Sequence, residues 1–104
     1  MSAEDFREVY ERHVGHVVSG DMKAALADMV QENLATVFDG VSVPRGAVDG
    51  FEIKDVRAEG DIRIGETVYA TPEGVIGLRS IWESRDGQWK AARLENFPAT
   101  GTSA

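Results

Sequence analysis

The stretch of sequence that decides the fold lies near the C-terminal end and reads Arg79-Ser80-Ile81-Trp82-Glu83-Ser84-Arg85-Asp86-Gly87-Gln88-Trp89. Asp-Gly between two runs of strand-forming residues is the strongest short-range signal of a β-hairpin, because both residues tolerate the positive φ angles of a type I′ turn. The pattern therefore predicts two antiparallel strands, over residues 75–84 and 88–97.

The register of this hairpin has two solutions. A two-residue turn pairs Glu83 with Lys90, whereas a glycine bulge at the turn pairs Glu83 with Trp89. A shift of one residue moves every side chain to the other face of the sheet. The sequence therefore leaves open which of Arg93 and Leu94 faces the core.

Three further strands are predicted upstream of the hairpin. Residues 34–41, 51–58 and 62–71 are rich in β-branched and aromatic residues, and segments containing Gly or Pro separate them. Gly65 indicates a bend or bulge in the third of these strands. The sheet should thus contain about five strands.

Two helices are predicted before the strands. Over residues 3–19, one helical face carries Phe6, Val9, Tyr10, His13, Val14 and Val17. Gly20 ends this helix and Asp21 caps a second one, whose expected buried stripe is Met22, Ala25, Leu26, Met29 and Val30. Helices followed by strands predict an α+β domain, in which a strongly curved antiparallel sheet encloses the helix pair as a cone.

Length and composition limit the possible functions. The 104 residues suffice for one domain, expected over residues 1–97, with a flexible tail at 98–104. A net charge of −7 argues against a nucleic-acid partner, and no apolar run is long enough to span a membrane. Without cysteine there are no disulfides or thiolate zinc sites, and we expect no metal and no cofactor. The first residues lack the pattern of a secretory signal, so we expect a cytoplasmic protein.

Three motifs resemble the nuclear transport factor 2-like superfamily, which includes ketosteroid isomerases and SnoaL-like polyketide cyclases. They are the helix-Gly-Asp-helix opening at 10–21, the segment 34–40 with Pro-Arg-Gly at 44–46, and the hairpin at 79–89. The resemblance implies a cystatin-like cone fold. Members usually have a third helix after the Pro-Arg-Gly-like loop, but only residues 47–50 are available for it here, so this helix looks deleted or cut to one turn.

The resemblance to the isomerases also implies candidate catalytic residues. Asp39 stands where the isomerases have a general-base aspartate, His13 where they have an oxyanion-hole tyrosine, and Ser80 where they have a protonated aspartate. The base is retained, while histidine and serine would supply the hydrogen bonds to an oxyanion. The residues expected to line a ligand pocket are Tyr10, Phe38, Tyr69, Leu78 and Trp82.

Two of these residues have a structural alternative. His13 is also compatible with a core histidine bonded to a backbone or carboxylate group, and Asp39 with a turn-forming residue before Gly40. His16 lies one helical turn from His13, but a histidine pair lacks the third ligand of a catalytic metal site.

Three functions are compatible with these patterns. The first is a small-ligand-binding pocket protein of the SnoaL-like type without established catalysis, forming a homodimer through its sheet and taking an apolar or carboxylate ligand. The second is an isomerase, cyclase or dehydratase with Asp39 as general base and His13 as donor or acid. The third is a protein-interaction module that uses the exposed sheet face and its tryptophans.

Overall fold

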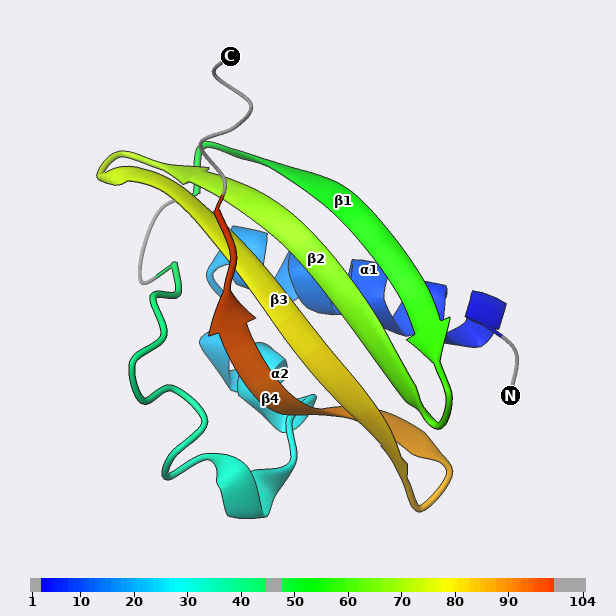
Figure 1. Cartoon of the computed structure of the whole chain (residues 1–104). Coiled ribbons are helices and arrows are strands. Elements are labelled where there is room, and N and C mark those ends of the chain that lie inside the picture. Colours follow the sequence, from blue (N-terminus) through cyan, green and yellow to red (C-terminus); the bar gives the residue numbers. More distant parts are fainter. Residues whose placement is uncertain (1–2, 45–47, 99–104) are drawn as a thin grey trace.

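The computed structural model describes the backbone of residues 3–44 and 48–98, and the side chains from Phe6 onward within those ranges. Two helices lie against one face of a curved antiparallel sheet (Figure 1). The elements are α1 (Ala3–Ser19), α2 (Met22–Ala27), the 3₁₀ helix η1 (Gln31–Asn33), β1 (Gly50–Glu59), β2 (Ile62–Thr71), β3 (Gly74–Arg85) and β4 (Gln88–Asn96). The strand order is β1-β2-β3-β4, so the predicted α+β cone is confirmed with four strands in the described ranges instead of about five.

The helices begin where the sequence predicts, but α2 is shorter than its apolar stripe. The Asp21 carboxylate accepts a hydrogen bond from the Ala24 N–H and caps α2 as expected. Met22 is exposed, whereas Met29 and Val30 are buried although they lie beyond the helix. The predicted buried stripe is therefore wrong at Met22. Met29 and Val30 are buried as predicted, but they lie beyond the C-terminal end of α2 and contact the sheet.

The predicted strand over residues 34–41 is wrong. Residues 34–40 form turns after η1. The edge of β4 that such a strand would need is already occupied, because the Val30 N–H donates to the Ala91 carbonyl (2.8 Å) and the Ala91 N–H to the Asp28 carbonyl (2.9 Å). The apolar residues of the segment contribute side chains to the core rather than backbone to the sheet.

The hairpin adopts the first of the two registers, with a two-residue turn. Asp86 and Gly87 have φ angles of 54° and 79°, as a type I′ turn requires, and Glu83 pairs with Lys90. A bulge in β4 then shifts the pairing, because Ile81 pairs with Arg93 while the next residue of β3 pairs with Ala91.

The bulges decide which side chains face the helices. The bulge at Ala92 lets Leu94 pack against the core and leaves Arg93 exposed on the other face. Gly65 keeps its register with both neighbouring strands, so the bulge predicted there is absent. The irregularity instead lies in β1 at Lys54.

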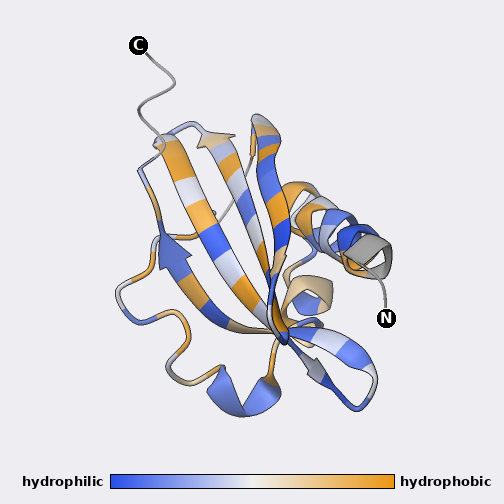
Figure 2. Ribbon diagram, turned by 45° about the vertical axis from the view of Figure 1, so that its right-hand side comes forward, coloured by the Kyte–Doolittle hydropathy of each residue, from blue (hydrophilic) through white to orange (hydrophobic). Residues whose placement is uncertain are grey.

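The two faces of the sheet differ in what covers them. Hydropathy alternates along the strands, and α1 and α2 cover one face (Figure 2). We call the opposite face the outer face; no element of the described ranges covers it (Figure 1). Between η1 and β1 no described residue is helical. Residues 45–47, which include the start of the 47–50 segment where the shortened helix is expected, and the tail beyond Pro98 lie outside the described residues. None of the described helices has the length and apolar character to span a bilayer.

Candidate functional site

Aromatic side chains fill the space between α1 and the sheet. The rings of Phe6 and Tyr10 stack with centroids 5.8 Å apart, and Trp82 meets them edge-on at 5.5 and 6.1 Å. Trp89 contacts Phe6 edge-on at 5.7 Å. All four side chains are buried, so this part of the cone is a packed core.

The Tyr10 side chain is held from two sides. Its ring lies directly on Gly65, where an added Cβ would stand less than 3.0 Å from three ring atoms. Its hydroxyl is 2.5 Å from the Thr67 Oγ1. Burial raises the pKa of Tyr10 to about 12, and burial also raises the pKa of Tyr69. Both hydroxyls therefore stay neutral well above physiological pH.

The structure brings two of the three candidate catalytic residues to one buried tryptophan. The His13 Nδ1 lies 3.1 Å from a carboxylate oxygen of Asp28, and its ring meets that of Trp82 edge-on at 5.1 Å. The Trp82 Nε1–H donates to the Ser80 Oγ at 2.7 Å. Asp39 lies in an exposed turn, and no contact among the described side chains joins it to His13 or Ser80.

The predicted ligand-lining residues all belong to the core or to its margin. Tyr10, Tyr69 and Trp82 are buried within it, and Phe38 and Leu78 pack against it. The described part of the chain also has two surface recesses, and none of the five residues lines either of them. Within the described ranges no group of three or more His, Asp or Glu side chains is placed to hold a metal ion.

The first recess is a groove of about 540 Å³ at the end of the sheet where β2 turns into β3. One wall is the segment of residues 41–44, and the other is the β2–β3 hairpin. The lining residues are Val41, Ser42, Val43, Pro44, Thr71, Pro72, Glu73, Gly74, Val75 and Ile76. Glu73 is the only charged side chain among these lining residues, and most of the others are apolar or small.

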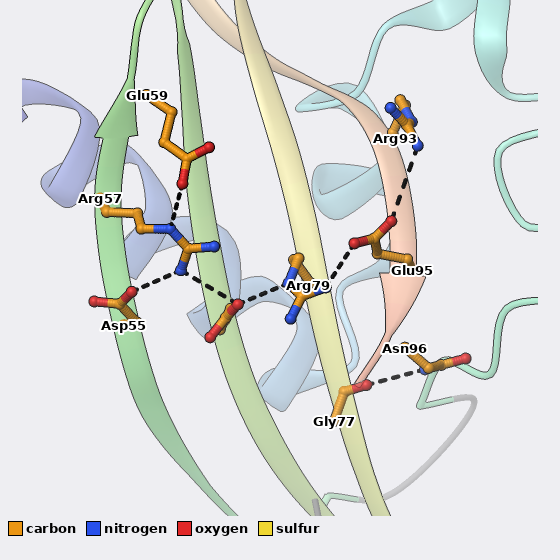
Figure 3. Close-up of polar contacts among 9 residues, drawn as sticks. Asp55, Arg57, Glu59, Gly77, Arg79, Arg93, Glu95 and Asn96 are labelled. Atoms are coloured by element: carbon orange, nitrogen blue, oxygen red, sulfur yellow. Dashed lines mark hydrogen bonds and ion pairs between the residues drawn. The ribbon is translucent and has the colours of Figure 1, made fainter. Parts of the chain in front are cut away.

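One side chain fixes the spacing between the walls of the groove. The Asn96 Nδ2 donates to the Gly77 carbonyl at 3.0 Å (Figure 3). It also donates to the Ser42 carbonyl at 2.9 Å, and the Asn96 Oδ1 accepts from the Ser42 N–H at 2.8 Å. Sequence reasoning missed Asn96. The Pro44 loop and the turn after Thr71 were visible as separate turn signals, but only the tertiary fold brings them together.

The second recess, of about 530 Å³, lies between the tips of the β1–β2 and β3–β4 hairpins. The Arg63 guanidinium lies over the Trp89 ring at 4.7 Å, and Asp61 and Glu83 complete the walls. The buried Arg63 Nε and Trp89 Nε1 have no hydrogen-bond partner among the described residues. This recess therefore combines charged side chains of both signs with a tryptophan covered by an arginine.

Charged side chains form a continuous row across the outer face (Figure 3). We call it the charge row; in order across the sheet its members are Asp55, Arg57, Glu66, Arg79, Glu95 and Arg93. Arg79 donates to Glu95 at 2.6 Å and to Glu66 at 2.7 Å, and Glu66 also accepts from Arg57 at 3.3 Å. The bond to Glu95, followed by that to Glu66, raises the pKa of the Arg79 guanidinium. Signs alternate along the whole row.

The comparison with known proteins identifies the fold. An NTF-2-like protein of unknown function from Burkholderia xenovorans LB400 superposes with a TM-score of 0.61 and 18% identity, over 96% of this chain and 92% of that one. A putative NTF2-like transpeptidase from Campylobacter jejuni superposes with a TM-score of 0.53 and 12% identity, over 83% of this chain and 95% of that one. No protein-family model and no curated protein matches the sequence. The chain therefore has the nuclear transport factor 2-like fold that its motifs predict.

Proposed function

We propose that this protein is a small-ligand-binding protein without established catalysis, and that it takes a small ligand with an apolar body in the groove between residues 41–44 and the β2–β3 hairpin. The observation that carries the proposal is the groove itself. Its volume of about 540 Å³ lies within the range of ligand sites, which measure roughly 300–1,000 Å³, and its walls combine apolar side chains, such as those of Val43 and Ile76, with polar groups. The packing of Phe6, Tyr10 and Trp82 in the interior also favours a site outside the cone.

A thermal-shift screen tests this proposal. Small ketones and carboxylic acids with an apolar body should raise the melting temperature, because a ligand present at about 100 times its Kd stabilises the folded state by about 2.7 kcal/mol. Val43→Glu, which places a charge in the wall of the groove, should abolish the shift. Met22→Glu makes the same change at an exposed position of α2 and should leave the shift intact. If no compound of a broad library raises the melting temperature of the wild-type protein or of Met22→Glu, the proposal is contradicted.

A second proposal concerns the partner: we propose a homodimer that packs through the outer face. The charge row favours it, because the alternating order Arg57, Glu66, Arg79, Glu95 is complementary to its own reverse. A two-fold axis between Glu66 and Arg79 would place each charge opposite one of the other sign on the second copy. Such an interface makes every contact twice, so complementarity across the axis is doubled.

Sedimentation equilibrium tests the homodimer. The wild-type chain should sediment with twice its monomer mass at micromolar concentration. Val68→Glu adds a charge to the outer face beside the row, since the flanking Thr67 and Tyr69 point to the helices, and it should shift the chain toward the monomer by at least tenfold in Kd. Met22→Glu adds the same charge on the helical side and should remain dimeric. A wild-type monomer at high concentration would rule the dimer out.

A further inference from the structure

Two buried hydrogen-bond donors lie close together in the second recess, at the end of the sheet away from the groove. The Arg63 guanidinium covers the Trp89 ring at 4.7 Å, and Trp89 is only 7% exposed. Neither the Arg63 Nε nor the Trp89 Nε1 bonds to any residue that the structure describes. Buried polar groups are nearly always hydrogen-bonded, because an unpaired donor loses its bond to water and gains none in return. This pair of N–H groups is therefore suited to an acceptor that a bound molecule supplies.

The Arg63 guanidinium has no counter-ion in the described part of the chain. Its Nη1 donates to the carbonyls of Gly60 at 3.2 Å and Ile62 at 3.0 Å, and no described carboxylate forms an ion pair with it. A guanidinium presents a planar fork of donors that matches the two oxygens of a carboxylate. The acceptor that best suits Arg63 is therefore a carboxylate.

The other walls of this recess carry the opposite charge, from Asp61 and Glu83. Glu83 is engaged by Arg85 at 2.9 Å, whereas Asp61 forms no ion pair within the described ranges. A simple anion would be repelled by these two carboxylates and by the net charge of −7. A ligand that carries an ammonium group as well as a carboxylate meets the opposite charge at both of its ends.

From these observations we infer that the second recess binds a free α-amino acid, with its carboxylate on Arg63 and the Trp89 indole N–H and its ammonium group on Asp61. The volume of about 530 Å³ lies within the range of small-molecule sites, roughly 300–1,000 Å³. Because both nitrogen atoms are buried where the guanidinium covers the ring, the ligand binds as the Arg63 side chain turns off the indole and opens both donors to the recess. The inference does not depend on the groove, which shares no lining residue with this recess.

An NMR titration of the ¹⁵N-labelled full chain with a panel of L-amino acids tests the inference. The chain has two tryptophans and so gives two indole N–H signals, which Trp89→Phe assigns. The Trp89 signal should move downfield on binding, because its proton gains an acceptor. The Trp82 signal should stay in place, since that N–H already donates to the Ser80 Oγ. Removing either the amine or the carboxylate from the best ligand should weaken binding roughly tenfold or more, because each group takes part in a charge-assisted contact.

Three variants locate the site. Arg63→Met removes the guanidinium but keeps an apolar chain beside the indole, and it should weaken binding roughly tenfold or more. Asp61→Asn, at an exposed position, should erase the preference for the amino acid over its analogue without the amine. Arg93→Met makes the first change on the exposed outer face and should leave the Kd unchanged. If Arg63→Met does not fold, Asp61→Asn carries the test alone.

The outcomes are distinct from those for the groove. A Trp89 signal that no amino acid moves, up to the limit of solubility, would overturn the inference. Equal binding of the analogue without the amine would overturn it too, since the recess would then be a simple anion site. Val43→Glu should leave this titration unchanged, so the two sites succeed or fail separately.

Discussion

Gly65→Ala is expected to destabilise the protein by about 3 kcal/mol, at the upper end of the cost of overpacking a core. The added Cβ would stand less than 3.0 Å from three atoms of the Tyr10 ring, far inside van der Waals contact. The ring has little room to retreat, because it stacks on Phe6, meets Trp82 edge-on and holds Thr67 through its hydroxyl. Urea unfolding followed by tryptophan fluorescence measures the loss.

Two controls give this prediction its specificity. Gly15→Ala lies on the exposed side of α1 with nothing near the new methyl group, and it should stabilise the protein by about 0.5–1 kcal/mol through helix propensity. In a Tyr10→Leu background the ring atoms that clash are gone, so Gly65→Ala should cost much less than in the wild-type protein. An equal cost in both backgrounds would show that the clash with Tyr10 is not the cause.

The second large effect is expected in alkaline solution. Burial raises the pKa of Tyr10 from near 10 to about 12, so the unfolded chain releases this proton first as the pH rises. The free energy of unfolding should be unaffected by this group below pH 10. It should fall by about 3 kcal/mol between pH 10 and 12, because each tenfold difference in proton affinity between the folded and unfolded states is worth about 1.4 kcal/mol. Tyr69, whose pKa burial also raises, acts in the same direction.

Urea unfolding at a series of alkaline pH values measures this slope, and the ultraviolet absorbance of tyrosinate reports ionisation separately. Tyr10→Phe keeps the ring but removes one titrating group and its hydrogen bond to Thr67, so the slope should become shallower while Tyr69 keeps its own contribution. Tyrosinate absorbance that develops fully near pH 10 in the folded wild-type protein would contradict the burial argument.

Short-range signals were enough to predict much of the fold. The type I′ preference of Asp86-Gly87 set the last hairpin, and the apolar spacing over residues 3–19 set α1. The strand predicted over residues 34–41 is wrong. Its β-branched and aromatic residues suit a strand, but they suit equally well a loop whose side chains pack into the core. What decides between them is whether the edge of β4 is free, and residues 28–30 already occupy that edge.

The candidate site was less predictable for the same reason. A glycine in a strand suits either a bulge or the close approach of a distant side chain, and only the position of Tyr10 shows that Gly65 serves the second purpose. The periodicity of α1 placed His13 on the buried face, but its carboxylate partner, Asp28, comes from beyond α2. The groove could not be predicted at all, since its walls are two turns that only the folded sheet brings together.

Asn96 has a consequence for how the groove can change. Its one amide group joins the connection after residue 40 to the sheet, while the aromatic core lies elsewhere and does not include it. Substitutions at position 96 or at the solvent-accessible residues 41–43 can therefore widen, narrow or reshape the groove without disturbing the aromatic core. Under the proposed binding function, ligand specificity and the packing of the aromatic core depend on separate sets of residues, so one scaffold could acquire new specificities by a few surface changes.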